Sequence, residues 1–212
     1  MRSVSGRSQA SIAPSFALWV ATLLLGAGVT WAEIGAAQDQ SVLRALVLRA
    51  SQSPEWQIEL AQWISWAGDA AQRSLVFIGC ALWLFWKKRP RAGLIMLVVP
   101  ALAGATSSIL KQVFARTRPD VAPHLDSISN LSFPSGHATS AIAILLLAAL
   151  LLPARRRMFW IGLAVIGAGA IGASRVLLGV HWPSDVLGGF LWGTGFALAG
   201  VAAARHWPDA RR

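Results

Sequence analysis

The sequence contains few charged residues, no tyrosine and a single cysteine. Charged residues make up 13% of the 212 residues and hydrophobic residues 55%, whereas about a quarter of the residues in soluble domains are charged. So few charges cannot cover a water-exposed surface, and we therefore expect lipid to surround much of the chain. The lone Cys80 lies in an apolar run, which excludes a disulfide within the chain and predicts a small buried apolar group.

Tryptophan is abundant instead, with eleven residues, and the net charge is +10. Tryptophan favours the membrane–water interface, where its ring is buried and its N–H is hydrated. A positive net charge in a soluble protein would suggest nucleic-acid binding. The distribution of charge along this chain, given below, indicates a membrane protein without a nucleic-acid partner.

Apolar stretches of near-membrane length predict an all-α fold, a bundle of six transmembrane helices that forms a single membrane domain over residues 1–212. The second stretch is the weakest, because Asp69 and Arg73 would have to lie at its outer end. The first stretch could imitate a signal peptide, but its length favours a retained helix. The predicted spans are Pro14–Ala32, Ala67–Trp86, Ala92–Phe114, Pro134–Leu152, Met158–Val180 and Pro183–Ala204.

The connecting segments differ strongly in charge. The N-terminus, residues 87–91, residues 155–157 and the C-terminal tail carry 12 of the 19 basic residues and one of the 9 acids, which leaves 7 basic residues and 8 acids on the other side. Positive charge collects on the cytoplasmic side of membrane proteins. We therefore expect both termini in the cytoplasm of a bacterial plasma membrane, with the less basic side facing outward.

A short amphipathic helix is predicted over Glu55–Ala67, between the first two spans. Trp56, Leu60 and Trp63 recur at helical spacing, and most polar residues lie off that stripe. We expect this helix to lie in the outer interface, either as a lid or lipid guide or as a simple connector. Glycines in the last two spans, Gly189 and Gly193 among them, predict close helix packing.

Two groups of polar residues fall at span ends on the outer side. Lys111 and Arg118 are seven residues apart, so they would share one stripe if the third helix continued that far. Each could instead be an interfacial cation whose head reaches water. Residues 133–137, Phe-Pro-Ser-Gly-His, precede an apolar run, and a proline in the first helical turn would leave the N–H groups of Ser135 and Gly136 free for an anion. His137 would then be a candidate general acid.

The third group is Ser174-Arg175, His181 and Asp185. Asp185 would lie in the first turn of the last span and could reach back to His181, fixing its tautomer for nucleophilic attack, although it could also serve only as a helix cap. Together the three groups bring three cations, a helix N-terminus, two histidines and a carboxylate to one face, as a phosphate site requires. Solvated loop positions are expected for Asp120, His124 and Asp126, and His206 is expected in the cytoplasmic tail, away from the site.

These residues resemble the motifs of the type 2 phosphatidic acid phosphatase superfamily, which also includes the vanadium haloperoxidases. The three motifs match in order and without substitution, over about the last 120 residues, with the core at residues 92–204. They are Lys111 to Arg118-Pro119, then Pro134-Ser135-Gly136-His137, then Ser174-Arg175 with His181 and Asp185.

The resemblance implies a role for each residue. His181 would form a phosphohistidine, Asp185 would orient it, and His137 would protonate the leaving oxygen. The phosphoryl oxygens would be held by Lys111, Arg118, Arg175, Ser135 and the N–H of Gly136. No metal or other cofactor is implied, since the three cations can neutralise the phosphate.

The sequence therefore predicts a membrane phosphatase that acts on a lipid phosphate or pyrophosphate held in the bilayer. Undecaprenyl pyrophosphate is favoured because an outward-facing site suits recycling of a lipid carrier; phosphatidylglycerophosphate, phosphatidic acid and lipid A phosphates also fit. The alternatives are a vanadate-dependent haloperoxidase and a non-enzymatic lipid transporter or scaffold. The sequence does not indicate an oligomeric state.

Overall fold

The structure, a computed structural model, describes residues 11–126, 131–151 and 154–207. Over those residues every regular element is a helix, and an isolated bridge pairs Thr117 with Leu131. The elements are α1 Ala13–Trp31, α2 Ala36–Leu46, α3 Glu55–Ala67, α4 Ala70–Trp86, α5 Pro90–Phe114, α6 Gly136–Leu151, the 3₁₀ turn η1 Ala154–Arg156, α7 Arg157–Leu177 and α8 Pro183–His206.

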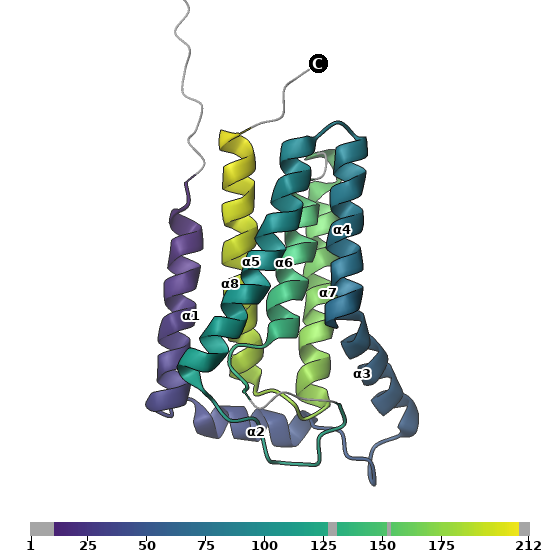
Figure 1. The fold of residues 1–212 in the computed structure, drawn as a ribbon. Helices are drawn as coiled ribbons and strands as arrows, with labels where there is room; N and C mark the ends of the chain where they lie inside the picture. The colour runs from purple at the N-terminus through teal and green to yellow at the C-terminus, as the bar shows by residue number, and fades with distance from the viewer. Residues whose placement is uncertain (1–10, 127–130, 152–153, 208–212) are drawn as a thin grey trace, which may run out of the picture.

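Helix α6 forms the centre of the bundle. It is apolar on all sides and buried along most of its length, as expected of a helix that other helices surround. Helices α5, α7 and α8 pack against it (Figure 1). Gly189 and Gly193 of α8 allow a close approach to α6, because a Cβ at Gly189 would lie 2.7 Å from the carbonyl oxygen of Ser135 and one at Gly193 would overlap that of Thr139. The predicted close packing at these glycines is therefore present.

Four helices among the described residues, α1, α5, α7 and α8, are long and apolar enough to cross a membrane. Helices α4 and α6 have 17 and 16 residues, or about 25 Å at 1.5 Å per residue, against a hydrocarbon core of about 30 Å. Both run alongside the longer helices in the bundle (Figure 1). The all-α prediction is thus confirmed, while the count of six spans rests on these two shorter helices.

Two helices lie at one end of the bundle (Figure 1). The sequence analysis missed α2, because its 11 residues are too few for a membrane span and mix polar with apolar side chains, of which only Asp39 and Leu43 are buried. Helix α3 occupies the predicted range Glu55–Ala67, and Trp56 and Trp63 expose more than half of their surface. Its position in a membrane interface stays a prediction.

The chain brings its polar span ends together at the end that carries α2 and α3. The C-terminal ends of α5 and α7 and the N-terminal ends of α6 and α8 all lie there, whereas the C-terminal end of α8 lies at the opposite end (Figure 1). His206 ends α8, 21 residues or about 32 Å from Asp185 along the helix axis. His206 is therefore remote from the predicted site, as expected.

Candidate functional site

His181 lies in the short turn between α7 and α8. Gly179 takes a left-handed conformation with φ 75°, and the backbone N–H of His181 donates to the carbonyl of Arg175 at 3.2 Å. The imidazole is buried, and its Nδ1 lies 3.3 Å from Oδ2 of Asp185, one turn into α8. Asp185 also accepts the N–H of Trp182 at 2.9 Å. The Asp185 carboxylate therefore both caps α8 and orients His181.

Asp185 has two further partners that the sequence analysis did not single out. Nη1 of Arg116 donates to Asp185 Oδ1 at 2.6 Å, and Nη2 of the same guanidinium donates to Asp39 of α2 at 2.8 Å. The hydroxyl of Ser132 donates to Asp185 Oδ2. Four groups thus hold one buried carboxylate, which leaves it little freedom to rotate.

Burial dominates the electrostatics of the two site groups that lie between helices. It lowers the pKa of His181 to about 3, against the opposing effect of its hydrogen bond to Asp185. Burial also lowers the pKa of Arg118 to about 10, helped by the nearby charge of Arg175. At neutral pH the imidazole is therefore neutral and able to act as a nucleophile, while the guanidinium remains charged.

Lys111 and Arg118 reach the site from different elements. Helix α5 ends at Phe114 because Ala115 adopts a left-handed conformation with φ 49°. The expected shared helical stripe is therefore wrong, and Arg118 lies in the loop that follows. Its Nη1 is 3.3 Å from His181 Nε2, while Nζ of Lys111 donates to the carbonyl of Ser132 at 3.0 Å.

Arg175, in the last turn of α7, is almost completely buried. Its Nη1 donates to the carboxylate of Asp126 and to the hydroxyl of Ser65 in α3. The expectation of a solvated position is therefore wrong for Asp126, because a buried guanidinium requires a counter-charge. His124 Nε2 lies 2.7 Å from the carbonyl oxygen of Pro119, and Asp120 is exposed.

The residues Pro134 to Gly136 differ in detail from the prediction. Helix α6 begins at Gly136, so Pro134 lies outside its first turn. The N–H of Ser135 donates to the carbonyl of Asp185 at 2.9 Å and is not free for an anion. A Cβ at Gly136 would meet no atom within 4 Å, so the backbone there is open to a ligand.

Two buried polar atoms in these segments have no hydrogen-bond partner among the described residues. They are the hydroxyl oxygen of Ser135 and Nε of Arg175. Buried polar atoms normally have partners. An oxygen of a bound phosphoryl group could accept a hydrogen bond from each of them.

His137 has an acidic partner from outside the three motifs. Its Nε2 lies 2.8 Å from Oδ1 of Asp69, at the junction of α3 and α4. Gly68 lets this junction approach the ring, since a Cβ there would lie 2.9 Å from Cδ2 of His137. The sequence analysis noted Asp69 only as a charge at a span end, and sequence spacing alone could not have paired residues 68 positions apart.

The described side chains also bear on metal binding. Within residues 11–126, 131–151 and 154–207, no three His, Cys, Asp or Glu side chains gather in a group that could hold a metal ion. The three cations of the site are suited to an anionic group instead. Metal independence of the reaction stays a prediction.

Comparison with known families shows which family has these motifs. Residues 92–209 match the model of the PAP2 superfamily. The chain belongs to the PAP2 superfamily. The match contains all eight predicted site residues and covers more than half of the chain.

Individual PAP2 proteins support the assignment. Phosphatidylglycerophosphatase B of Bacillus subtilis is 33% identical over 83% of this chain and 87% of its own length. Lipid A 1-phosphatase of Rhizobium johnstonii is 33% identical over 62% of this chain and 58% of its length, and undecaprenyl-diphosphatase of Sulfolobus acidocaldarius is 32% identical over 57% and 59%.

A solved PAP2 structure shares the fold. The crystal structure of a transmembrane PAP2-type phosphatidylglycerolphosphate phosphatase from Bacillus subtilis superposes with a TM-score of 0.75, at 28% identity, over 93% of this chain and 98% of the other. With its membrane-length helices, this PAP2 protein is a membrane lipid phosphatase.

Proposed function

We propose that this PAP2 protein hydrolyses a lipid phosphate through a phosphohistidine on His181, without a metal ion. The contact between His181 and Asp185 carries the proposal. Because Nδ1 faces the carboxylate at 3.3 Å, its proton stays on that side and the lone pair of Nε2 faces Arg118. A phosphoryl group bound to Arg118 would therefore lie in front of the nucleophilic nitrogen.

The reaction proceeds in two displacements. His181 Nε2 attacks phosphorus, a nitrogen–phosphorus bond forms, and the bond from phosphorus to the leaving oxygen breaks. His137 gives its proton to that oxygen, and it later takes a proton from the water that attacks the phosphohistidine and releases phosphate. Asp185 stabilises the positive imidazole during both steps.

The phosphoryl oxygens are held by side chains that meet at the same end of the bundle. Lys111, Arg118 and Arg175 supply positive charge, and the hydroxyl of Ser135, the N–H of Gly136 and Nε of Arg175 supply hydrogen bonds. Donors fixed before the substrate arrives stabilise the charge of the transition state most effectively. Asp69 acts through His137: its carboxylate orients the imidazole and stabilises its protonated form.

The substrate is a lipid whose phosphate reaches this end of the bundle while its hydrocarbon stays in the bilayer. Phosphatidylglycerophosphate is supported by the Bacillus subtilis relative, which aligns over most of its length. Undecaprenyl pyrophosphate, which the sequence analysis favours, is supported by the shorter match to an undecaprenyl-diphosphatase. We propose phosphatidylglycerophosphate as the preferred substrate, because the match to the Bacillus subtilis phosphatase covers 83% of this chain and 87% of that protein.

The proposed topology has six spans, with α4 and α6 as the short ones and both termini in the cytoplasm. It follows from the 12 basic residues assigned to one side of the membrane. The site then opens on the outer, extracytoplasmic side, where α3 would lie in the interface. Labelling of single cysteines in a Cys80→Ser background, from either side of sealed vesicles, tests this orientation.

Purified protein in excess chelator tests the mechanism. We expect full hydrolysis of phosphatidylglycerophosphate and a base-stable, acid-labile phosphoenzyme, both absent from His181→Ala. His206→Ala at the far end of α8 is the matched control and should retain both. Loss of activity that only a divalent cation restores, or a phosphoenzyme in His181→Ala, would contradict the proposal. Parallel rates on the four candidate lipids rank the substrates.

A further inference from the structure

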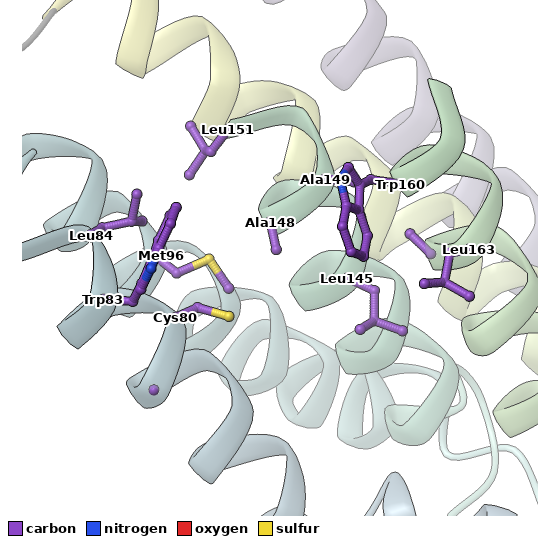
Figure 2. A pocket seen from close by; sticks show the side chains of 12 residues that line it. Cys80, Trp83, Leu84, Met96, Leu145, Ala148, Ala149, Leu151, Trp160 and Leu163 are labelled. Carbon is purple, nitrogen blue, oxygen red and sulfur yellow. The ribbon is translucent and has the colours of Figure 1, made fainter. Parts of the chain in front are cut away.

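Two cavities meet at the end of the bundle opposite the candidate site. The first has a volume of about 430 Å³ and is lined by apolar residues of α4, α5, α6 and α7. Trp83 and Trp160 stand on opposite sides of it, Ala148 lies between them, and Leu151 closes one end (Figure 2). Leu163 on its rim is half exposed, so the cavity is open toward the surrounding lipid.

The second cavity is basic. It has a volume of about 350 Å³ and shares Leu151 with the first. Its charged lining consists of Arg89, Arg157 and Arg205, which come from the turn before α5, the start of α7 and the end of α8. Arg89 Nη1 donates to the carbonyl of Leu151 at 2.9 Å, so its guanidinium is held at the boundary between the two cavities.

Membrane orientation alone does not require this arrangement. Arg155 and Arg156 are exposed, and such solvated charges are enough to mark a cytoplasmic side. Arg89, Arg157 and Arg205 instead line one cavity, which borders the apolar one at Leu151.

We propose that the paired cavities bind one anionic phospholipid of the leaflet at this end. Its phosphate lies among the three arginines, and one acyl chain passes Leu151 into the apolar cavity. Basic pockets between transmembrane helices are suited to anionic head groups, and the adjoining apolar space favours a lipid over a free anion. The site is distinct from the catalytic end, since Arg205 lies 22 residues, or about 33 Å, from Pro183 along α8.

Native mass spectrometry of the detergent-purified protein tests the proposal. Dioleoyl phosphatidylglycerol should remain bound as one molecule, and dioleoyl phosphatidylcholine should not. Arg89→Gln/Arg205→Gln should weaken binding roughly 30-fold, because each basic side chain near a lipid phosphate contributes about a factor of five. Arg155→Gln/Arg156→Gln removes the same charge outside the cavities and should bind as the wild type does.

Further variants separate the two cavities from the active site. Ala148→Phe fills the apolar cavity and should weaken phosphatidylglycerol binding, and free glycerol phosphate at the same concentration should not bind. Arg118→Gln alters the catalytic end and should retain the lipid. Arg205→Gln alone, at an exposed side chain, should fold and lose about fivefold.

Three results would overturn the proposal. Equal weakening by the two double variants would show that binding follows net charge alone. Loss of the lipid from Arg118→Gln would place it in the active site. Binding of glycerol phosphate as tight as that of the lipid would identify a free anion as the ligand.

Discussion

Asp69 places a carboxylate oxygen 2.8 Å from Nε2 of His137, and so links the α3–α4 junction to the first turn of α6. The two residues come from parts of the chain with different sequence signals. His137 belongs to the second PAP2 motif, whereas Asp69 precedes the residues that match the superfamily. The contact gives the N-terminal part of the chain a direct position in the proposed proton transfer.

Asp69→Asn tests this position. An amide cannot stabilise a protonated imidazole, so we expect slower protonation of a poor leaving group. Hydrolysis of an alkyl phosphate lipid should fall about 10- to 100-fold, a part of the roughly 10²- to 10⁴-fold that general acid catalysis contributes. Hydrolysis of p-nitrophenyl phosphate, whose leaving group needs little help from an acid, should change less than about threefold.

The ratio of the two rates is the decisive measurement for Asp69. Glu59→Gln removes an exposed carboxylate from α3 and serves as the control, with both rates unchanged. If Asp69→Asn slowed both substrates equally, a general disturbance of the site would explain the loss, and the role in proton transfer would be wrong.

Arg116 is expected to position Asp185 through its short contact with Oδ1. Arg116→Gln removes this contact and the one to Asp39, so Asp185 gains freedom to rotate. Displacement of a catalytic group by about 1 Å can cost roughly 100-fold, and we expect kcat to fall about 10- to 100-fold with little change in KM. Arg44→Gln on the exposed face of α2 is the control. A change in KM alone would indicate that Arg116 contacts substrate instead.

The sequence was informative where chemistry requires fixed residue spacing. Asp185 lies four residues after His181 at a helix start, so their contact followed from local geometry. Lys111 and Arg118 were correctly assigned to one end of the bundle but not to the right elements, because the left-handed conformation of Ala115 has no strong sequence signal.

The missed residues make contacts between segments distant in sequence. Arg116, Asp39 and Asp69 carry no motif, and their partners are set by the packing of α2 and of the α3–α4 junction against the ends of α6 and α8. Helix α2 itself was missed because its 11 residues are too short for a span and nearly half of them are polar. Such contacts depend on tertiary structure, which hydropathy and periodicity do not encode.

The pKa of His181 yields a spectroscopic prediction. Burial lowers it to about 3, so the imidazole should stay neutral from about pH 5 to pH 8, where an ordinary histidine titrates near pH 6.5. In NMR spectra of ¹⁵N-histidine-labelled protein, the His181 signals are those that disappear in His181→Gln. They should not shift over this pH range. The unfolded chain takes up a proton that the folded chain does not, so this residue makes stability fall as pH drops from about 6.5 toward 3. A midpoint near 6.5 for these signals would contradict the assignment.

The packing of α8 on α6 predicts opposite effects for two glycine substitutions. In Gly193→Ala the new methyl group would overlap the carbonyl of Thr139 and lie 2.6 Å from Ile142. Overpacking of this kind typically costs about 1–3 kcal/mol, so the melting temperature in detergent should fall. Gly162→Ala in α7 meets no atom within 4 Å and should be neutral or stabilise the helix by about 0.5–1 kcal/mol. Because His181 and Asp185 lie at the start of α8, Gly193→Ala should also lower kcat, and equal melting temperatures for the two variants would show that α8 can shift to accept the methyl group.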